Sequence, residues 1–143
     1  PELLPFVALI VLSACANAGV VGPEPAVQTG AAMTAGAPTD VELRIGERAR
    51  VPPVAVTFTR VATDSRCPTG VDCVWEGDAV VELAVERDDG ATASVSLHTN
   101  GGLAQEATAA GVRLRLVRLE PYPTAGRPIE AADYRVVLSV AEP

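Results

Sequence analysis

The chain has 143 residues, of which 48% are hydrophobic and only 3% aromatic, so it predicts one domain of ordinary size with an aliphatic core. Its formal net charge of -7 argues against nucleic-acid binding, which requires a basic surface, and against polybasic anchoring on anionic lipid. Because β-branched side chains fit a pleated sheet, the abundance of valine favours strands.

Residues 1–14 are expected to be a signal peptide. The run from residue 3 to residue 14 is almost continuously apolar, and it is too short to span a membrane but matches the apolar region of a secretory signal. Such signals normally begin with basic residues, whereas the first basic residue here is Arg44 and the chain starts with Pro1. We therefore expect that the signal peptide is truncated at its start.

The apolar run ends in Leu12-Ser13-Ala14-Cys15, which resembles the lipobox of bacterial lipoproteins. This resemblance implies that the Cys15 thiolate takes up a diacylglyceryl group, that cleavage frees its amine, and that fatty acyl chains such as palmitate anchor the protein in the membrane. Each buried CH₂ contributes about 0.8 kcal/mol, so two or three chains make a permanent anchor. The alternatives are an ordinary signal peptide or a buried segment with an incidental cysteine.

Residues 15–40 are expected to form a lipidated, disordered tether. They are rich in Ala, Gly, Pro and Thr and have no usable periodicity, and their prolines and glycines disfavour both helices and central strands. Ala16, and not Asp, follows the cysteine, which by analogy with Gram-negative lipoproteins implies the outer membrane. The predicted location is thus the bacterial cell envelope, with the domain outside the cytoplasm.

Residues 41–143 are predicted to form an all-β domain, either an antiparallel β-sandwich or a small barrel of six to seven strands. Apolar and polar residues alternate in short segments separated by turn residues, and Asp88-Asp89-Gly90 is a strong hairpin signal. The clearest segments are 41–45, 54–58, 81–85, 93–97, 112–116 and 134–140.

Two stretches of this domain are harder to interpret from sequence. Residues 103–110 are the one helix-compatible window, and a turn of helix or a loop is expected there. Glu130 to Tyr134, just before the last strand, resembles a tyrosine corner, in which the hydroxyl bonds to the backbone. A plain core tyrosine at the start of a strand is the alternative for Tyr134.

The most distinctive stretch contains Cys67 and Cys73. If Cys15 carries lipid, these two cysteines form an even pair in an oxidising compartment, where disulfides persist. Pro68 and Gly70 allow the chain between them to turn back, which predicts a Cys67–Cys73 disulfide.

This stretch resembles a segment of small bacterial envelope lipoproteins. The shared pattern is Asp-Ser-Arg-Cys-Pro, five residues between the cysteines, and then a Trp and a Gly. The resemblance is close here and loose over the rest of the domain. It implies a secreted β-domain and no particular activity.

Three interpretations of the stretch stay open. It is a structural disulfide that pins an edge, a rigid recognition or inhibitory loop, or a redox-active pair, although the spacing is not Cys-x-x-Cys. As a recognition loop, its contact residues would be Arg66, Pro68, Asp72 and Trp75. The Trp75 ring is expected to pack against the sulfur atoms.

No catalytic, cofactor or metal site is assigned. His98 is the only histidine, and neither an orienting acid nor a nucleophile can be recognised for it by motif. Zinc would require at least three ligands, and no calcium-loop spacing is present. One acidic cluster near the cysteines is interpreted as a solvated rim; it comprises Asp64, Asp72, Glu76 and Asp78.

The preferred hypothesis is a lipid-anchored, non-enzymatic β-domain with a binding or structural role in the envelope. It would contact the membrane through lipid on Cys15 and bind an unidentified envelope protein or ligand, with the disulfide loop as its contact surface. The alternative is a small enzyme or enzyme inhibitor. A closed pocket lined by His98 and acidic groups would favour an enzyme, whereas a projecting loop would favour binding.

Overall fold

The computed structural model describes residues 36–143. The predicted signal peptide at 1–14, the lipidation site Cys15 and most of the predicted tether at 15–40 lie outside the described residues. The first strand begins at Thr39, slightly before the predicted start of the domain at Val41. Within the described part, no helix is long and apolar enough to cross a membrane.

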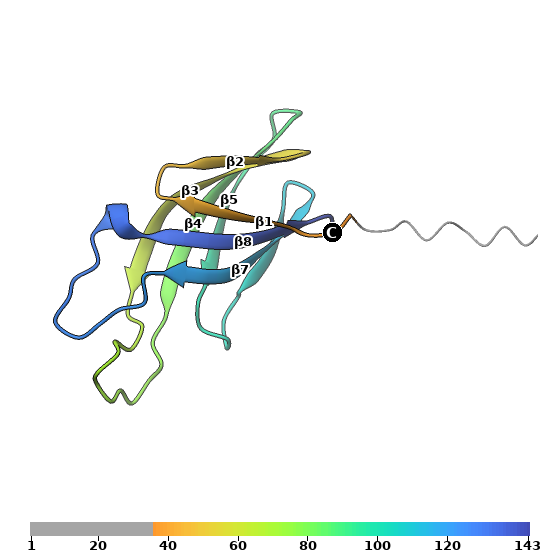
Figure 1. Cartoon of the computed structure of the whole chain (residues 1–143). Helices are drawn as coiled ribbons and strands as arrows, with labels where there is room; N and C mark the ends of the chain where they lie inside the picture. Colours follow the sequence, from red (N-terminus) through yellow and green to blue (C-terminus); the bar gives the residue numbers. More distant parts are fainter. Residues whose placement is uncertain (1–35) are drawn as a thin grey trace, which may run out of the picture. The chain divides into compact units, whose positions relative to one another are not determined.

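The described residues form eight strands in two four-stranded antiparallel sheets, as Figure 1 shows. Sheet A has the order β1-β8-β7-β6 and sheet B the order β2-β3-β4-β5. The strands are β1 Thr39–Arg44, β2 Arg48–Val51, β3 Val54–Asp64, β4 Ala79–Arg87, β5 Thr92–His98, β6 Glu106–Ala109, β7 Val112–Glu120 and β8 Arg135–Ala141. One 3-10 turn, η1, covers Ala131–Asp133. The predicted all-β antiparallel sandwich is confirmed, with eight strands where six to seven were expected.

The hydrophobic core lies between the sheets and follows from the period-two sequence pattern. In β4 the side chains of Val81, Leu83 and Val85 are buried, whereas those between them are more exposed. β8 in sheet A alternates in the same way, and its buried residues belong to the same core cluster. Phe58 of β3 is the largest of the fully buried side chains. The rest of the core is aliphatic apart from Tyr134, as the composition predicts.

Two short edge strands, β2 and β6, account for the difference in strand count. β6 occupies Glu106–Ala109, so the expectation of a helical turn or a loop over 103–110 is wrong for these four residues, whereas 103–105 do form a loop. It pairs with β7 through a tight turn in which Ala110 and Gly111 both have positive φ. The cross-strand hydrogen bonds of this hairpin outweigh the weak local preference of an alanine-rich segment for helix.

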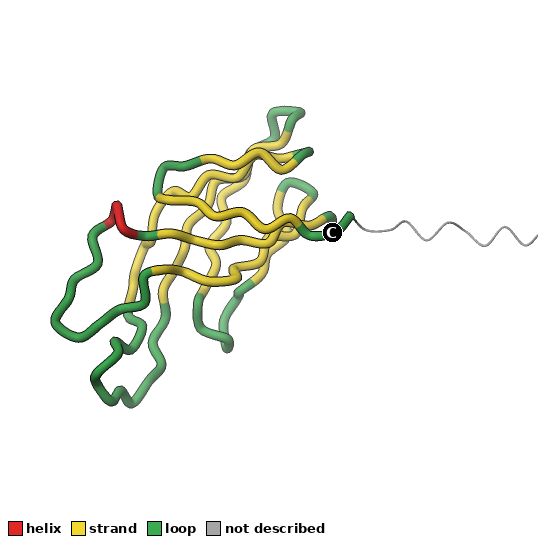
Figure 2. The backbone as a smooth tube through the Cα atoms, in the orientation of Figure 1, coloured by secondary structure: helices red, strands yellow, loops and turns green. Residues whose placement is uncertain are grey.

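The connections between strands differ at the two ends of the sandwich. At the turn end, tight turns join β2 to β3, β4 to β5 and β6 to β7. At the loop end there are a tight turn from β1 to β2 and three longer connections. We call the longer ones the cystine loop (65–78), the β5–β6 loop (99–105) and the β7–β8 loop (121–134); they are drawn in green in Figure 2 except for the short helix in the last. Gly36 lies beside Glu142 at the turn end. The described chain therefore begins at the end opposite these loops.

Candidate functional site

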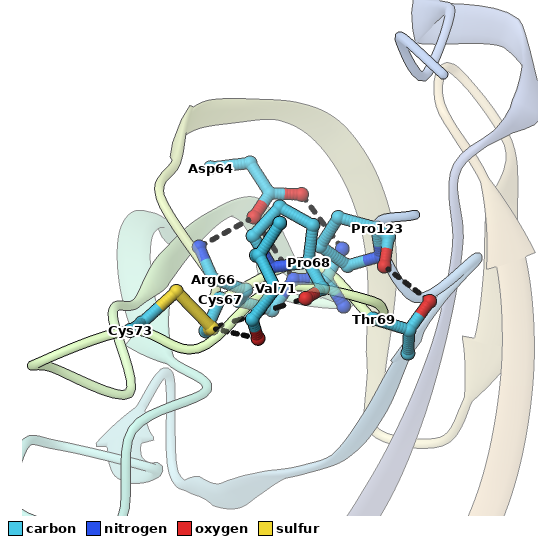
Figure 3. The surroundings of a disulfide bond; sticks show 8 residues. All are labelled: Asp64, Arg66, Cys67, Pro68, Thr69, Val71, Cys73 and Pro123. Carbon is cyan, nitrogen blue, oxygen red and sulfur yellow. Dashed lines mark hydrogen bonds and ion pairs between the residues drawn. A yellow bond between two sulfur atoms is a disulfide. The ribbon is translucent and has the colours of Figure 1, made fainter. Parts of the chain in front are cut away.

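The cystine loop is closed by the predicted Cys67–Cys73 disulfide, with 5.9 Å between the two Cα atoms (Figure 3). At the base of the loop, the Ser65 amide donates to the Asp78 carbonyl at 2.7 Å, and the Cys67 amide donates to the Glu76 carbonyl at 2.9 Å. These hydrogen bonds continue the pairing of β3 with β4 beyond the sheet. The base of the loop is therefore fixed, while the loop projects from the domain (Figure 1), and its residues 71–76, which we call the tip, are exposed.

Arg66 lies in the interior, with only 6% of its surface exposed. Its guanidinium donates to both oxygens of the Asp64 carboxylate, at 2.9 and 2.6 Å, and to the carbonyls of Leu119 and Pro121. It also lies 5.3 Å from the centre of the Tyr122 ring, within cation–π range. These donors attach the cystine loop to the end of β7 and to Pro121 just after it. Arg66 thus has a structural role, and it also lines the pocket between the loops.

Asp64 is shared between Arg66 and Tyr134, whose hydroxyl donates to Asp64 Oδ2 at 3.0 Å. Burial raises the pKa of Asp64, but the hydrogen bonds and charge of Arg66 outweigh burial and hold that pKa below its usual value. Burial and the neighbouring Asp64 carboxylate raise the pKa of Tyr134 to about 12. The tyrosine-corner interpretation is therefore wrong, because this hydroxyl bonds to a side chain and not to the backbone.

Asp78 joins the cystine loop to the β5–β6 loop. Its carboxylate accepts hydrogen bonds from the backbone amides of Thr99 and Asn100, both at 3.0 Å, and lies 2.6 Å from Nδ1 of His98. Burial raises the pKa of Asp78, but the hydrogen bonds from His98 and Asn100 lower it further than burial raises it. His98 thus has an acidic partner that the sequence pattern did not reveal.

The β7–β8 loop is joined to the cystine loop by backbone pairing as well as by Arg66. The Thr69 amide donates to the Pro123 carbonyl at 2.9 Å, and the Ala125 amide donates to the Thr69 carbonyl at 3.1 Å. In Figure 3, Thr69 and Pro123 are seen side by side. With the Asp78 contacts, these bonds make the three loops one connected surface.

The predicted acidic rim is only partly present. Asp64 and Asp78 are held in the two separate internal networks described above. Asp72 and Glu76 are exposed, and they make no ion pair within residues 36–143. Among the described residues no group of three or more His, Cys, Asp or Glu side chains is placed to hold a metal ion.

Trp75 is 81% exposed, so the prediction that its ring packs against the sulfur atoms is wrong. β4 begins only at Ala79, and the chain turns at Gly77, which has a positive φ of 70°. A side chain at Gly77 would overlap the backbone of Ser65. The turn at this glycine brings the chain back to Ser65 after Trp75. Trp75 therefore precedes β4 and does not share a strand face with Cys73. Pro68, another of the predicted contact residues, is half-buried.

Exposed apolar side chains concentrate at the loop end. Of the six large hydrophobic residues that are exposed in the described part of the chain, five belong to the three loops and one to β7. They are Val71, Val74, Trp75, Leu103 and Tyr122 in the loops and Val117 in β7. Of these six residues only Trp75 was a candidate contact residue from the sequence, because an isolated apolar residue in a loop has no periodicity to show whether it is buried.

The three loops also enclose an open pocket of about 250 Å³, whose lining includes Glu76, Thr99, Asn100 and Tyr122. Its lining does not include His98. A larger hollow of about 460 Å³ lies on the outer face of sheet B, over β3, β4 and β5. The arrangement at the loop end is a broad apolar and acidic surface with a shallow hollow, which suits contact with a partner better than enclosure of a small substrate.

Comparison with known proteins identifies no relative: no family model, curated protein or solved structure matches the chain.

Proposed function

We propose that this chain is a bacterial lipoprotein of the cell envelope that binds a partner through its loop end. The observation that carries the binding role is the gathering of five of the six exposed large apolar side chains on three adjoining loops. A concentration of exposed apolar side chains at one end of a domain is typical of a surface that meets another molecule. The binding site is thus the surface formed by the cystine, β5–β6 and β7–β8 loops.

The fixed shape of these loops supports the proposal. Arg66 and Asp78 bind backbone atoms of neighbouring loops, and the disulfide closes the cystine loop. A surface that is ordered before binding loses less conformational entropy when it meets its partner. Rigid loops on a β-scaffold are a common way to present contact residues.

The position of the chain entry also supports a tethered binding module. The described chain begins at the turn end, and the exposed apolar residues lie at the opposite end. A tether that begins at a lipidated Cys15 would attach to the domain at the turn end. The loop end would then stay free to meet a partner in the envelope.

The lipid anchor is tested by expressing the chain with a complete signal peptide and analysing the membrane fraction by mass spectrometry. We expect a protein that starts at Cys15 and carries acyl mass, with Cys15→Ser as the unlipidated control. A soluble protein that starts at another residue and has no acyl mass would refute lipidation.

The binding role is tested with the isolated envelope of the producing bacterium. Purified full chain is added to labelled envelope extract, and the bound components of two variants are compared. Leu103→Ser with Tyr122→Ser should abolish specific retention, because both side chains lie at the loop end. Val117→Ser, a matched exposed change on β7, should retain wild-type binding. Equal retention by both variants would refute the loop end as the binding surface.

An enzyme inhibitor is the second candidate, because Val74 and Trp75, directly after the disulfide-bonded Cys73, are exposed by 92% and 81%. Inhibitors of peptidases commonly present a rigid exposed segment of this kind to an active site. Titration of a chymotrypsin-like peptidase, which accepts aromatic residues, tests this candidate. Inhibition that disappears in Trp75→Ala would support it, and rapid cleavage of the loop without inhibition would exclude it for this class of peptidase.

A further inference from the structure

Trp75 is the only tryptophan of the chain and lies at the tip of the cystine loop, next to Val74. The two side chains are the most exposed large hydrophobic residues in residues 36–143. The base below them is held by the disulfide and by the amide-to-carbonyl bonds of Ser65 and Cys67. Tryptophan on a rigid support is the side chain most often found as the dominant contact of a protein interface.

The charges beside Trp75 differ from those on the sheets. Several acidic residues on the strands pair with arginine, as in Glu82 with Arg60 and Glu86 with Arg48, although Asp40 and Glu120 do not within residues 36–143. Asp72 and Glu76 flank Trp75 in sequence, are exposed, and have no arginine partner among the described residues. The tip therefore combines an apolar centre with a negative border that the domain itself leaves uncompensated.

We propose that Trp75 is the anchor for a protein partner that offers an apolar pocket bordered by Arg or Lys side chains. This inference rests on the proposed binding function of the loop end and adds the chemistry of the partner. Burial of the indole would supply the attraction, and Asp72 and Glu76 would pair with the basic border and orient the complex.

A protein fits this tip better than a lipid surface does. If the Trp75 ring entered a bilayer, Asp72 and Glu76 would be carried toward the headgroups, where anionic lipids repel carboxylates. Tips that insert into membranes normally carry Lys or Arg beside their apolar residues. This tip carries the opposite charge.

The first experiment places a photoreactive phenylalanine analogue in the lipidated full chain, in the producing bacterium. Separate variants carry it at Trp75, at Leu103, at Tyr122 and, as the control, at Val117. Position 75 should give a crosslink to one protein upon illumination, and Val117 should give none. The crosslinked peptide should be apolar and should lie next to Arg or Lys residues of that protein.

The second experiment measures affinity for the crosslinked protein, using Trp75 emission as the signal and calorimetry for variants that lack the indole. Trp75→Ala should weaken binding roughly 30-fold or more, as expected for a dominant contact. Asp72→Asn and Glu76→Gln should each weaken it roughly two- to fivefold and reduce its salt dependence. Unchanged affinity in both charge variants would overturn the proposal that Arg or Lys side chains border the partner's pocket.

Membrane insertion is tested with vesicles of phosphatidylcholine, alone and mixed with phosphatidylglycerol. No shift of Trp75 emission is expected with either vesicle. A blue shift, or a photo-crosslink from position 75 to lipid only, would overturn the proposal that Trp75 binds a protein.

The failure of this inference can be told apart from failure of the binding function itself. Protein crosslinks from Leu103 or Tyr122 but none from position 75 would overturn the role of Trp75 and leave the loop-end function standing. No protein crosslink from any of the three loop positions would overturn both. Far-UV circular dichroism and the mass of the intact disulfide would confirm that each variant is folded.

Discussion

The two ends of this sandwich close the same sheets by different chemistry. At the turn end the chain reverses through local signals, such as the positive-φ pair Ala110–Gly111 between β6 and β7. At the loop end, longer segments are held by contacts between residues far apart in sequence, including Arg66 with the Leu119 carbonyl and Asp64 with Tyr134. Exposed loops have little apolar area to bury, so fixing their shape requires hydrogen bonds and ion pairs drawn partly into the interior.

The largest effect is expected from breaking the buried pair at the loop end. Arg66→Ala leaves the Asp64 carboxylate buried beside the Tyr134 hydroxyl and frees two carbonyls, so we expect it to lower the free energy of unfolding by about 3–5 kcal/mol. Chemical denaturation of the purified domain measures the loss. Arg60→Ala is the matched control, because Arg60 also binds a carboxylate through two nitrogens but on the exposed face of sheet B.

The control should lose far less stability than Arg66→Ala, since water and salt screen an exposed pair. Equal losses in the two variants would mean that burial does not determine how much an ion pair contributes to the free energy of unfolding. The contrast between a loop end held by a buried ion pair and a sheet that carries an exposed ion pair would then fail.

Removal of the disulfide is expected to have the next largest effect. Cys67→Ser with Cys73→Ser removes a short covalent loop, which by the chain-entropy argument should lower the free energy of unfolding by about 2 kcal/mol. The β-sheet signal in circular dichroism should stay, because the core lies between the sheets. Unchanged stability would indicate that the backbone bonds at the base of the cystine loop suffice to close it.

The pH dependence at the loop end follows from Tyr134. Folding raises its pKa from a usual value of 10.0 to about 12, so its contribution to stability is complete below pH 10 and is lost as the pH rises toward 12. In that window the unfolded chain releases the phenolic proton before the folded chain does. We expect the stability advantage of wild type over Tyr134→Phe to shrink across this range. Parallel stability curves for the two proteins would contradict the Asp64–Tyr134 contact.

The smallest effect on stability is expected at the tip. Trp75→Ala should change the free energy of unfolding by no more than about 0.5 kcal/mol, because the ring has few neighbours to lose. Binding and stability should therefore separate at this residue, in contrast to Arg66. A loss well above 1 kcal/mol would show that Trp75 packs against the domain in solution.

The sequence predicted the strands that have a clear alternating pattern, because each such strand presents one face to the core. β4 and β7 fall where Val81 to Val85 and Val112 to Leu116 alternate with polar residues. The short edge strand β6 escaped prediction, because its alanines are compatible with helix and its pairing depends on β7. The disulfide was predictable from the parity of the cysteines.

The interior contacts of the candidate site were not predictable in the same way. Arg66 and Asp64 are close in sequence, but the carbonyls that accept from Arg66 lie at the end of β7 and just after it, far along the chain. His98 gained its partner Asp78 only when β4 and β5 came side by side. The exposure of Trp75 depends on the start of β4 and on the turn at Gly77, neither of which spacing alone reveals.

The pairing of β1 with β8 has a consequence for how the domain reaches its native state. Thr39 pairs with Val140, so the first strand finds its neighbour in the last. If the chain leaves the cytoplasm in extended form, sheet A cannot be completed until its C-terminal strand has crossed. Closure of so long a segment slows folding, and until then the edge of β1 that β8 will cover is open to wrong pairing. The edge is polar at Asp40, Glu42 and Arg44, which discourages such encounters before β8 arrives.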